Sequence, residues 1–298
     1  MTEVFGRKWE LLFEGTKLTE EYKMDFEVPF DDDPTIDIST LKIYNLSDDT
    51  IRKLKNHNME IRLNAGYAGN VGTILHGRVK DLRTDWVGTD RITTVKVMDY
   101  EENWLEKTIQ RTYKTDVEAS TILIDVIKQA GLTPGYIGLP VNKIYKGGKT
   151  IDGTCAKIIA DIVPDCGAKY NVSGGKINIS DRKHGNETGM LIDSNNGMIG
   201  IPQDFVKEET YKVNSTVVEY KDVGGKQKAE IKHVEVDKKR KLYGYNIKML
   251  LNHQIRTDQI IRLGSYVAPS AGLYRVVSGR HDGTEFITEA EIQELNTF

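Results

Sequence analysis

A two-residue alternation of apolar and polar side chains is the feature that most constrains this fold. The stretch MDFEVPF at residues 24–30 is apolar at every second position, and MEIRLNA at residues 59–65 repeats the pattern. Such alternation is typical of strands that bury one face and expose the other. The turn-like stretches DDDP, AGYAGNVG and WVGTD separate these segments. We therefore expect a β-barrel or sandwich over the first hundred residues.

The pattern changes between about residues 101 and 180. Residues 115–118 have the spacing of a capping box, an apolar stripe follows at 122–127, and Gly131 is suited to end the helix. A second helix is expected from near Thr154 to just before Pro164. A β-hairpin should follow, with AKYNV and KINIS joined by a turn at 173–175. This part of the chain is predicted to be a small α+β domain.

Alternation returns in the last third, where strands are expected at 217–220, 231–236, 243–251, 255–263, 274–277 and 286–295. The basic run KKRK at 238–241 lies between two of these strands. We expect it at a solvated hairpin end, although it could contact DNA or an acidic partner. The predicted fold is mainly β with an α+β insertion: two β-barrel domains, 1–105 and 186–298, flank a small α/β domain, 106–185.

Composition narrows the class of protein. The 298 residues can bury a large core, and the net charge of −3 excludes a polycation over the whole chain. Two cysteines are too few for a disulfide framework. The N-terminus lacks the apolar core of a signal peptide, and no run of about 18 apolar residues could span a membrane. We expect a cytoplasmic protein without a membrane segment.

Residues 43–67, IYNLSDDTIRKLKNHNMEIRLNAGY, interrupt two predicted strands with a short helix. Ser47 is a good N-cap, and the two aspartates after it lie where the helix dipole favours negative charge. Ile51 and Leu54 are spaced to pack onto the sheet. The asparagines at 56 and 58 can end the helix, because asparagine tolerates the left-handed conformation.

Several motifs suggest chemistry, but each has a simpler interpretation. GKT at 148–150 resembles the end of a phosphate loop, but Lys143 occupies a required glycine position, so a turn is favoured. DSNNG at 193–197 resembles half of a calcium loop, and an Asx turn fits better. Cys155 is expected to be a core residue, with a thiol nucleophile as the alternative. The six histidines are scattered, so residue chemistry predicts no catalytic residue, cofactor or metal site.

Three segments, in this order, resemble a known family. They are IYNLSDDTIRKLKN with MEIRLNAGY and GTILHGRVKDL; DSNNGMIGIPQ; and KMLLNHQIRTDQIIRLGS with GLYRVVSGRHDGTEFITEAEI. The chain resembles the late-control-D-like baseplate-hub proteins of phage tails and R-type bacteriocins, especially those of Gram-positive hosts. The resemblance marks motif residues that could lie at interfaces: Asn45, Leu46, Ile51, Leu54, Gly66, Tyr67, Gly77, Gly197, Leu250, Leu251, Asn252, Gly272 and Tyr274.

The resemblance implies a structural role without catalysis. Such hubs form a homotrimer whose barrels make a pseudo-sixfold ring. One face of the ring meets the hexameric tail tube or a tube-initiator protein, and the other holds a trimeric central spike. Baseplate wedge proteins are further implied partners, and DNA would pass through the lumen. Assembly would take place in the host cytoplasm, and the protein would then be part of the virion or bacteriocin particle.

The chain departs from this family in its third motif. Similar proteins carry a proline and a Pro-Gly turn where this chain has His253 and Thr257-Asp258. The span from Pro202 to Leu250 is also longer than in many relatives. Two alternatives stay open, a tail-associated cell-wall hydrolase and a β-rich receptor- or glycan-binding module. We do not expect a lytic domain, because the last predicted strand lies directly before Phe298, and the aromatic residues that could bind a glycan are spread along the chain.

Overall fold

A computed structural model describes residues 6–32, 37–56, 58–98, 103–173, 176–181, 185–223, 226–265 and 272–295. At 103, 173 and 209–238 only the backbone is described. The end of the predicted DDDP turn, the glycine pair of the 173–175 turn, and two of the six histidines, His57 and His184, lie outside the described residues.

The N-terminal β region contains seven strands and one helix. Their bounds are β1 (Arg7–Phe13), β2 (Thr16–Thr19), β3 (Met24–Phe30), β4 (Ile38–Tyr44), α1 (Asp48–Leu54), β5 (Glu60–Tyr67), β6 (Asn70–Val87) and β7 (Asp90–Met98). The predicted alternation is confirmed in β3, where every apolar residue of MDFEVPF except the proline is buried. Helix α1 is confirmed as well. The Ser47 side chain accepts a hydrogen bond from the Thr50 backbone N–H, and Ile51 and Leu54 are buried.

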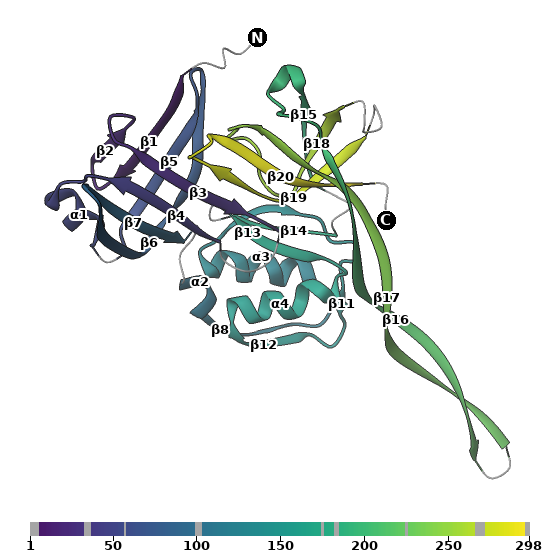
Figure 1. The fold of residues 1–298 in the computed structure, drawn as a ribbon. Coiled ribbons are helices and arrows are strands. Elements are labelled where there is room, and N and C mark those ends of the chain that lie inside the picture. The colour runs from purple at the N-terminus through teal and green to yellow at the C-terminus, as the bar shows by residue number, and fades with distance from the viewer. Residues whose placement is uncertain are drawn as a thin grey trace.

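The middle of the chain, residues 103–181, forms what we call the α/β unit (Figure 1). Its elements are α2 (Asn103–Glu106), β8 (Thr108–Tyr113), β9 (Val117–Glu118), α3 (Ala119–Ala130), β10 (Thr133–Ile137), β11 (Ile144–Tyr145), β12 (Lys149–Thr154), α4 (Cys155–Asp165), β13 (Lys169–Ser173) and β14 (Lys176–Ser180). The predicted hairpin is confirmed as the antiparallel pair of β13 and β14.

Two predicted helix boundaries in the α/β unit are wrong. Helix α3 does not start in a capping box at 115–118, because those residues contain the left-handed Asp116 and the short strand β9; Glu118 is the N-cap and makes no side-chain cap. Helix α4 begins after Thr154 as expected but continues through Pro164. Pro164 is the penultimate residue of the helix, so the N–H donor that it lacks is missing only from the last turn. Gly131 ends α3 in the left-handed conformation, as predicted.

The C-terminal β region contains β15 (Asn186–Asp193), η1 (Ser194–Asn196), β16 (Gln203–Val223), β17 (Lys226–Leu250), β18 (Gln259–Gly264), β19 (Leu273–Asp282) and β20 (Ile287–Glu294). Strands β16 and β17 form a long two-stranded ribbon that extends away from the rest of the molecule (Figure 1). The expected hairpin end at KKRK is wrong, because residues 238–241 lie within β17 and pair with 208–211 of β16. The strand predicted from residue 255 begins only at Gln259, and β15 was not predicted.

The fold is mainly β, as predicted, but the described strands do not close into barrels. A thirteen-stranded sheet follows the order β16-β17-β20-β19-β3-β4-β7-β6-β5-β1-β2, with β18 and β15 continuing from β19. A barrel closes only if its first and last strands meet. Here β3 pairs with β4 on one edge and with β19 on the other, so the C-terminal region occupies the edge that would close the N-terminal sheet.

Among the residues that the structure describes, buried apolar side chains form three clusters. The cluster of the N-terminal β region includes Leu251 and Phe286 from the C-terminal β region. The C-terminal cluster in turn includes Phe30 from β3. The third cluster consists of residues between Trp104 and Ile179, all within the α/β unit. The two β regions therefore share core residues, whereas the α/β unit has a core of its own.

Candidate assembly surfaces and the joint between the β regions

The two β regions join along β3 and β19. This antiparallel ladder runs from Gly279 opposite Phe30 to Asp282 opposite Glu27. A Cβ atom at Gly279 would lie 2.3 Å from the Glu289 carbonyl oxygen and 2.5 Å from the Phe30 ring. Glycine at this position therefore permits the close approach of the two regions.

Phe286, in the turn between β19 and β20, packs across this joint into the core of the N-terminal β region. Its buried ring packs edge-on against Tyr67, at a centroid distance of 5.4 Å, and against Phe26, at 6.2 Å. Its backbone is left-handed, with φ at 65°, which is strained for an aromatic residue. The Tyr67 hydroxyl and the Leu251 backbone N–H both donate hydrogen bonds to its carbonyl oxygen, at 3.0 and 3.1 Å.

Several motif residues predicted from the sequence meet near this joint. Tyr67 and Leu251 contact Phe286 directly, and Asn252 donates its backbone N–H to the Thr288 hydroxyl at 3.0 Å. Gly66 precedes Tyr67 and passes so close to the next strand that a Cβ would lie 2.1 Å from the Asn70 carbonyl oxygen. These residues hold the fold together; whether they also contact another subunit stays a prediction.

The remaining motif residues lie elsewhere. Tyr274 is buried in the C-terminal cluster, and a Cβ at Gly272 would meet its ring. The carbonyl oxygen of left-handed Gly197 accepts a hydrogen bond from the Leu250 N–H at 2.9 Å. Gly77 pairs with Ile61 in the β5–β6 ladder. The motif residues on and before α1, Asn45, Leu46, Ile51 and Leu54, form a separate group.

The hairpin tip of β6 and β7 lies beside α1 and carries exposed apolar side chains. The side-chain amide of Asn45 donates a hydrogen bond to Asp90 at 3.1 Å, and Arg91 pairs with Asp48 at 2.5 Å. These contacts fix the tip against the start of the helix. Trp86 on this tip is 71% exposed, and its neighbour Val87 is 60% exposed. Tryptophan is enriched among the residues that contribute most to binding at the centres of protein interfaces.

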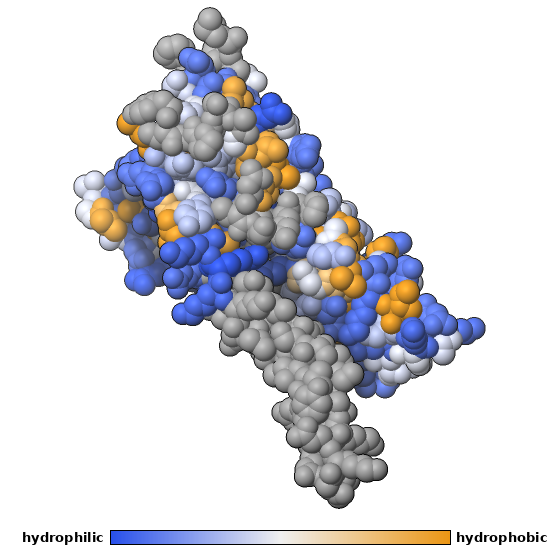
Figure 2. Space-filling view, turned by 90° about the vertical axis from the view of Figure 1, so that its right-hand side faces the viewer, coloured by the Kyte–Doolittle hydropathy of each residue, from blue (hydrophilic) through white to orange (hydrophobic). Residues whose placement is uncertain are grey.

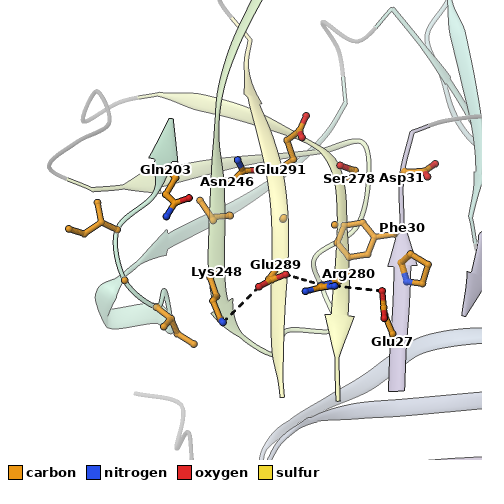
Figure 3. A pocket seen from close by; sticks show the side chains of 17 residues that line it. Glu27, Phe30, Asp31, Gln203, Asn246, Lys248, Ser278, Arg280, Glu289 and Glu291 are labelled. Carbon is orange, nitrogen blue, oxygen red and sulfur yellow. Dashed lines mark hydrogen bonds and ion pairs between the residues drawn. The ribbon is translucent and has the colours of Figure 1, made fainter. Parts of the chain in front are cut away.

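A hollow of about 760 Å³ lies on the outer surface where the two β regions join. Its lining includes a row of charged side chains on β17, β20, β19 and β3. The row runs from Lys248 through Glu289 and Arg280 to Glu27 (Figure 3). The closest pair in the row joins the Arg280 Nε and Glu289 at 2.9 Å. Within this row the two cations and two carboxylates balance one another, and Asp31 and Glu291 add two more carboxylates to the lining of the hollow.

Apolar residues flank this hollow at the start of the ribbon. Ile199 and Ile201 are exposed on the segment before β16, and Ile201 is 56% exposed. They belong to DSNNGMIGIPQ, the second motif of the resemblance. Figure 2 shows the side of the molecule from which the ribbon extends, and its apolar residues form separate patches on a largely hydrophilic surface.

His281 is a buried titratable group at the joint. It is fully buried on β19, its Nδ1 lies 2.9 Å from the Thr288 hydroxyl, and its ring packs on Phe30 at 5.1 Å. Burial, with the positive charge of Arg256 and the nearby His253, lowers the pKa of His281 to about 3. Burial and Arg256 also lower the pKa of His253.

Acid should therefore weaken the joint. The unfolded chain binds a proton at His281 near pH 6.5, whereas the folded chain resists this until about pH 3. The contribution of neutral His281 to the free energy of unfolding is fully present above pH 6.5, and it is lost progressively as the pH drops toward 3. Between pH 6.5 and 4.5 we expect His281 to remove about 2–3 kcal/mol from the free energy of unfolding. Urea titrations of the wild type and His281→Gln at several pH values should show a flatter profile in the variant.

The matched control is His76→Gln, which removes an exposed histidine on β6. Its urea midpoints should keep the acid-sensitive profile of the wild type. Parallel profiles for wild type and His281→Gln would contradict the assignment of acid sensitivity to the joint.

The three motifs that suggested a nucleophile, a calcium loop or a phosphate loop have structural roles in the fold. Cys155 is fully buried at the start of α4, and burial raises the pKa of its thiol, which is the opposite of what a nucleophile needs. DSNNG forms the predicted Asx turn, with the Asp193 carboxylate accepting from the backbone N–H groups of Asn195 and Asn196. GKT lies at a turn, in which the Gly148 N–H donates to the Tyr145 carbonyl.

Across the described parts of the chain, no three His, Cys, Asp or Glu side chains gather closely enough to hold a metal ion. In the same residues, no helix is long and apolar enough to cross a membrane.

Sequence reasoning missed the residues that lock the joint and the exposed tip. Phe286 was expected at the start of a strand, and His281 was counted only among the scattered histidines. Nothing in the local sequence indicates a left-handed phenylalanine. Trp86 did carry a signal, because a tryptophan within a predicted turn is expected to be exposed.

Comparison with known proteins identifies the fold. No family model matches the sequence, and none of the curated proteins matches it. A prophage MuSo2 43 kDa tail protein from Shewanella oneidensis matches in structure with a TM-score of 0.61 at 9% identity, over 96% of this chain and 98% of that chain. A tail protein from Neisseria meningitidis MC58 gives 0.57 at 9% identity, over 97% of each chain.

A third structure widens the comparison. An E. coli component of the type VI secretion system, described as similar to the bacteriophage T4 tail proteins gp27 and gp5, gives a TM-score of 0.55 at 9% identity, over 95% of this chain and 76% of that chain. The chain thus has the fold of phage tail proteins and of type VI secretion proteins related to them. The prediction of a tail-type fold is confirmed at this level, and these neighbours are described as tail and secretion-system components, not as enzymes.

Proposed function

We propose that this chain is a structural baseplate hub that joins the hexameric tail tube to the trimeric central spike of a phage tail or phage-tail-like bacteriocin. The observation that carries the proposal is the structural match of nearly the whole chain to nearly the whole of two solved tail-protein chains. The E. coli neighbour, described as similar to gp27 and gp5, supports a position in the tail near the spike.

The proposed protein acts as a homotrimer, with two β regions per chain contributing to a pseudo-sixfold ring. The shared core of the β regions supports this arrangement, because it would let the two β regions of each chain act as one rigid segment of such a ring. We also propose that the chain has three domains: an N-terminal β domain at 1–105, an α+β domain at 106–185 and a C-terminal β domain at 186–298. The protein would assemble in the host cytoplasm and then reside in the tail, in contact with tube, spike and wedge proteins.

Purified particles provide the direct test. We expect three copies of this chain per tail, measured by quantitative mass spectrometry, and a map of the particle should place the chain on the tail axis between tube and spike. Absence of the chain from purified tails, or a position at the tail periphery, would reject the hub role.

The exposed tip beside α1 is the proposed contact with a neighbouring copy. Replacing Trp86 and Val87 with serine should leave the fold intact, because both side chains are largely exposed. Truncation of a central interface tryptophan costs about 2 kcal/mol, so binding should weaken about thirtyfold. Particle yield from a complemented deletion strain should fall accordingly. Val141→Ser changes a similarly exposed residue on the α/β unit and should keep the wild-type yield.

A further inference from the structure

A buried polar cluster lies where the α/β unit meets the large sheet. It contains Arg275 on β19, Asp32 after β3, Asp258 before β18 and Asn171 on β13, all of them buried. Arg275 donates one hydrogen bond to Asp32 at 2.9 Å and another to Asp258. The Asn171 side-chain amide donates to the second carboxylate oxygen of Asp258 at 2.6 Å. This last bond joins the α/β unit to the sheet.

Asp258 is the centre of the cluster. Its backbone is left-handed, with φ at 63°, a conformation that aspartate and asparagine adopt more readily than most residues. Its N–H donates to the Val276 carbonyl at 3.1 Å, and its carbonyl accepts from the Asn186 N–H at 2.7 Å. A Cβ at Gly185 would lie 2.4 Å from that carbonyl oxygen. One residue therefore fixes the start of β18, strand β19 and the chain that leaves the α/β unit.

The hydrogen bond from Asn171 to Asp258 matters because the α/β unit shares none of the three apolar clusters with the β regions. Leu251 and Phe286 of the C-terminal β region lie in the core of the N-terminal one, and Phe30 of the N-terminal β region lies in the core of the C-terminal one. The core of the α/β unit lies wholly between Trp104 and Ile179. A unit with a separate core can keep its own fold while its orientation changes, since relative motion is the default where no large apolar interface joins two bodies.

We propose that the Asn171–Asp258 hydrogen bond, supported by Arg275 and Asp32, is a clasp that sets the orientation of the α/β unit on the sheet. Opening the clasp would let the unit turn as a body while both parts stay folded. A tail component with such a device could change shape without unfolding. The proposal does not depend on the role of the chain as a hub.

The test measures the distance between the two bodies. Spin labels at Lys128→Cys on α3 and Lys42→Cys on β4 use exposed positions, and native Cys155 and Cys166 are fully buried. Pulsed electron spin resonance should give one narrow distance for the otherwise wild-type chain. Asn171→Asp places two carboxylates at hydrogen-bond distance, and their repulsion should broaden and shift the distribution. Adding Asp258→Asn restores an amide–carboxylate pair and should restore the narrow distance.

Asn178→Ala is the matched control. Asn178 donates to the Asn171 side-chain oxygen at 3.2 Å within the α/β unit and does not take part in the contact to the sheet, so its removal should keep the wild-type distance. A folded Asn171→Asp protein with the wild-type distance would overturn the proposal. Loss of helix and strand circular dichroism in Asn171→Asp and in Asn171→Ala would also overturn it, because the cluster would then be part of a single core.

Discussion

Replacing Arg275 with methionine is expected to lower the free energy of unfolding by about 3–5 kcal/mol, because two buried carboxylates lose their cation. The Arg275 side chain is only 3% exposed and bridges Asp32 and Asp258. Burial alone would lower its pKa, but the charges of the two aspartates outweigh burial and raise it, so the guanidinium stays charged. Urea titration at neutral pH, followed by circular dichroism, measures the loss.

Arg280→Met provides a control on the same strand. Arg280 also bridges two carboxylates, Glu289 and Glu27, but it is about half exposed. Surface ion pairs contribute about 0–1 kcal/mol, so this variant should be nearly as stable as the wild type. Equal losses in the two variants would show that burial does not decide the strength of the Arg275 cluster. Arg275→Lys should fall between them, since lysine keeps the charge but not the planar fork.

The parts of the fold that could be predicted are those governed by local periodicity. The alternation in β3 and the cap of α1 were read directly from residues 24–30 and from Ser47, and both are confirmed. In each case the signal and the structure involve residues a few positions apart. The left-handed Gly131 at the end of α3 follows the same logic.

Long-range pairing was not predictable in this way. The alternation of β3 shows that one face is buried but does not say that its outer edge pairs with β19, so the sequence suggested closed barrels where the sheet is open. The basic run at 238–241 looked like a hairpin end because charged residues are common there. Its actual position in the middle of β17 depends on pairing with residues some thirty positions earlier in β16.

The third motif shows what the resemblance added. It identified Thr257-Asp258 as a departure from a Pro-Gly turn, and the structure gives a physical reason for the aspartate. Asp258 keeps the left-handed backbone that a glycine would have, and its carboxylate binds Arg275 and Asn171. His253, the other departure, packs its ring where a Cβ on Gly72 would stand, 2.2 Å from the nearest ring atom. Neither partner could be found from local sequence.

Phe286→Ala should be the other strongly destabilising substitution, with an expected loss of about 3–5 kcal/mol in the free energy of unfolding. The ring fills the core of the N-terminal β region from the C-terminal one, so its removal leaves a cavity at the joint. Phe286→Gly should be less harmful than Phe286→Ala by about 1 kcal/mol, because glycine adopts the left-handed backbone without strain.

This order reverses what an ordinary strand position would show, and Phe26 provides the comparison. Phe26 packs in the same cluster from within β3, and it is not among the residues with positive φ. There, glycine should be the more harmful replacement, because it adds backbone entropy to the unfolded chain. Urea titrations of the four variants give the two differences. If alanine proved better than glycine at both positions, the left-handed backbone at Phe286 would carry no measurable strain, and the joint would depend on ring packing alone.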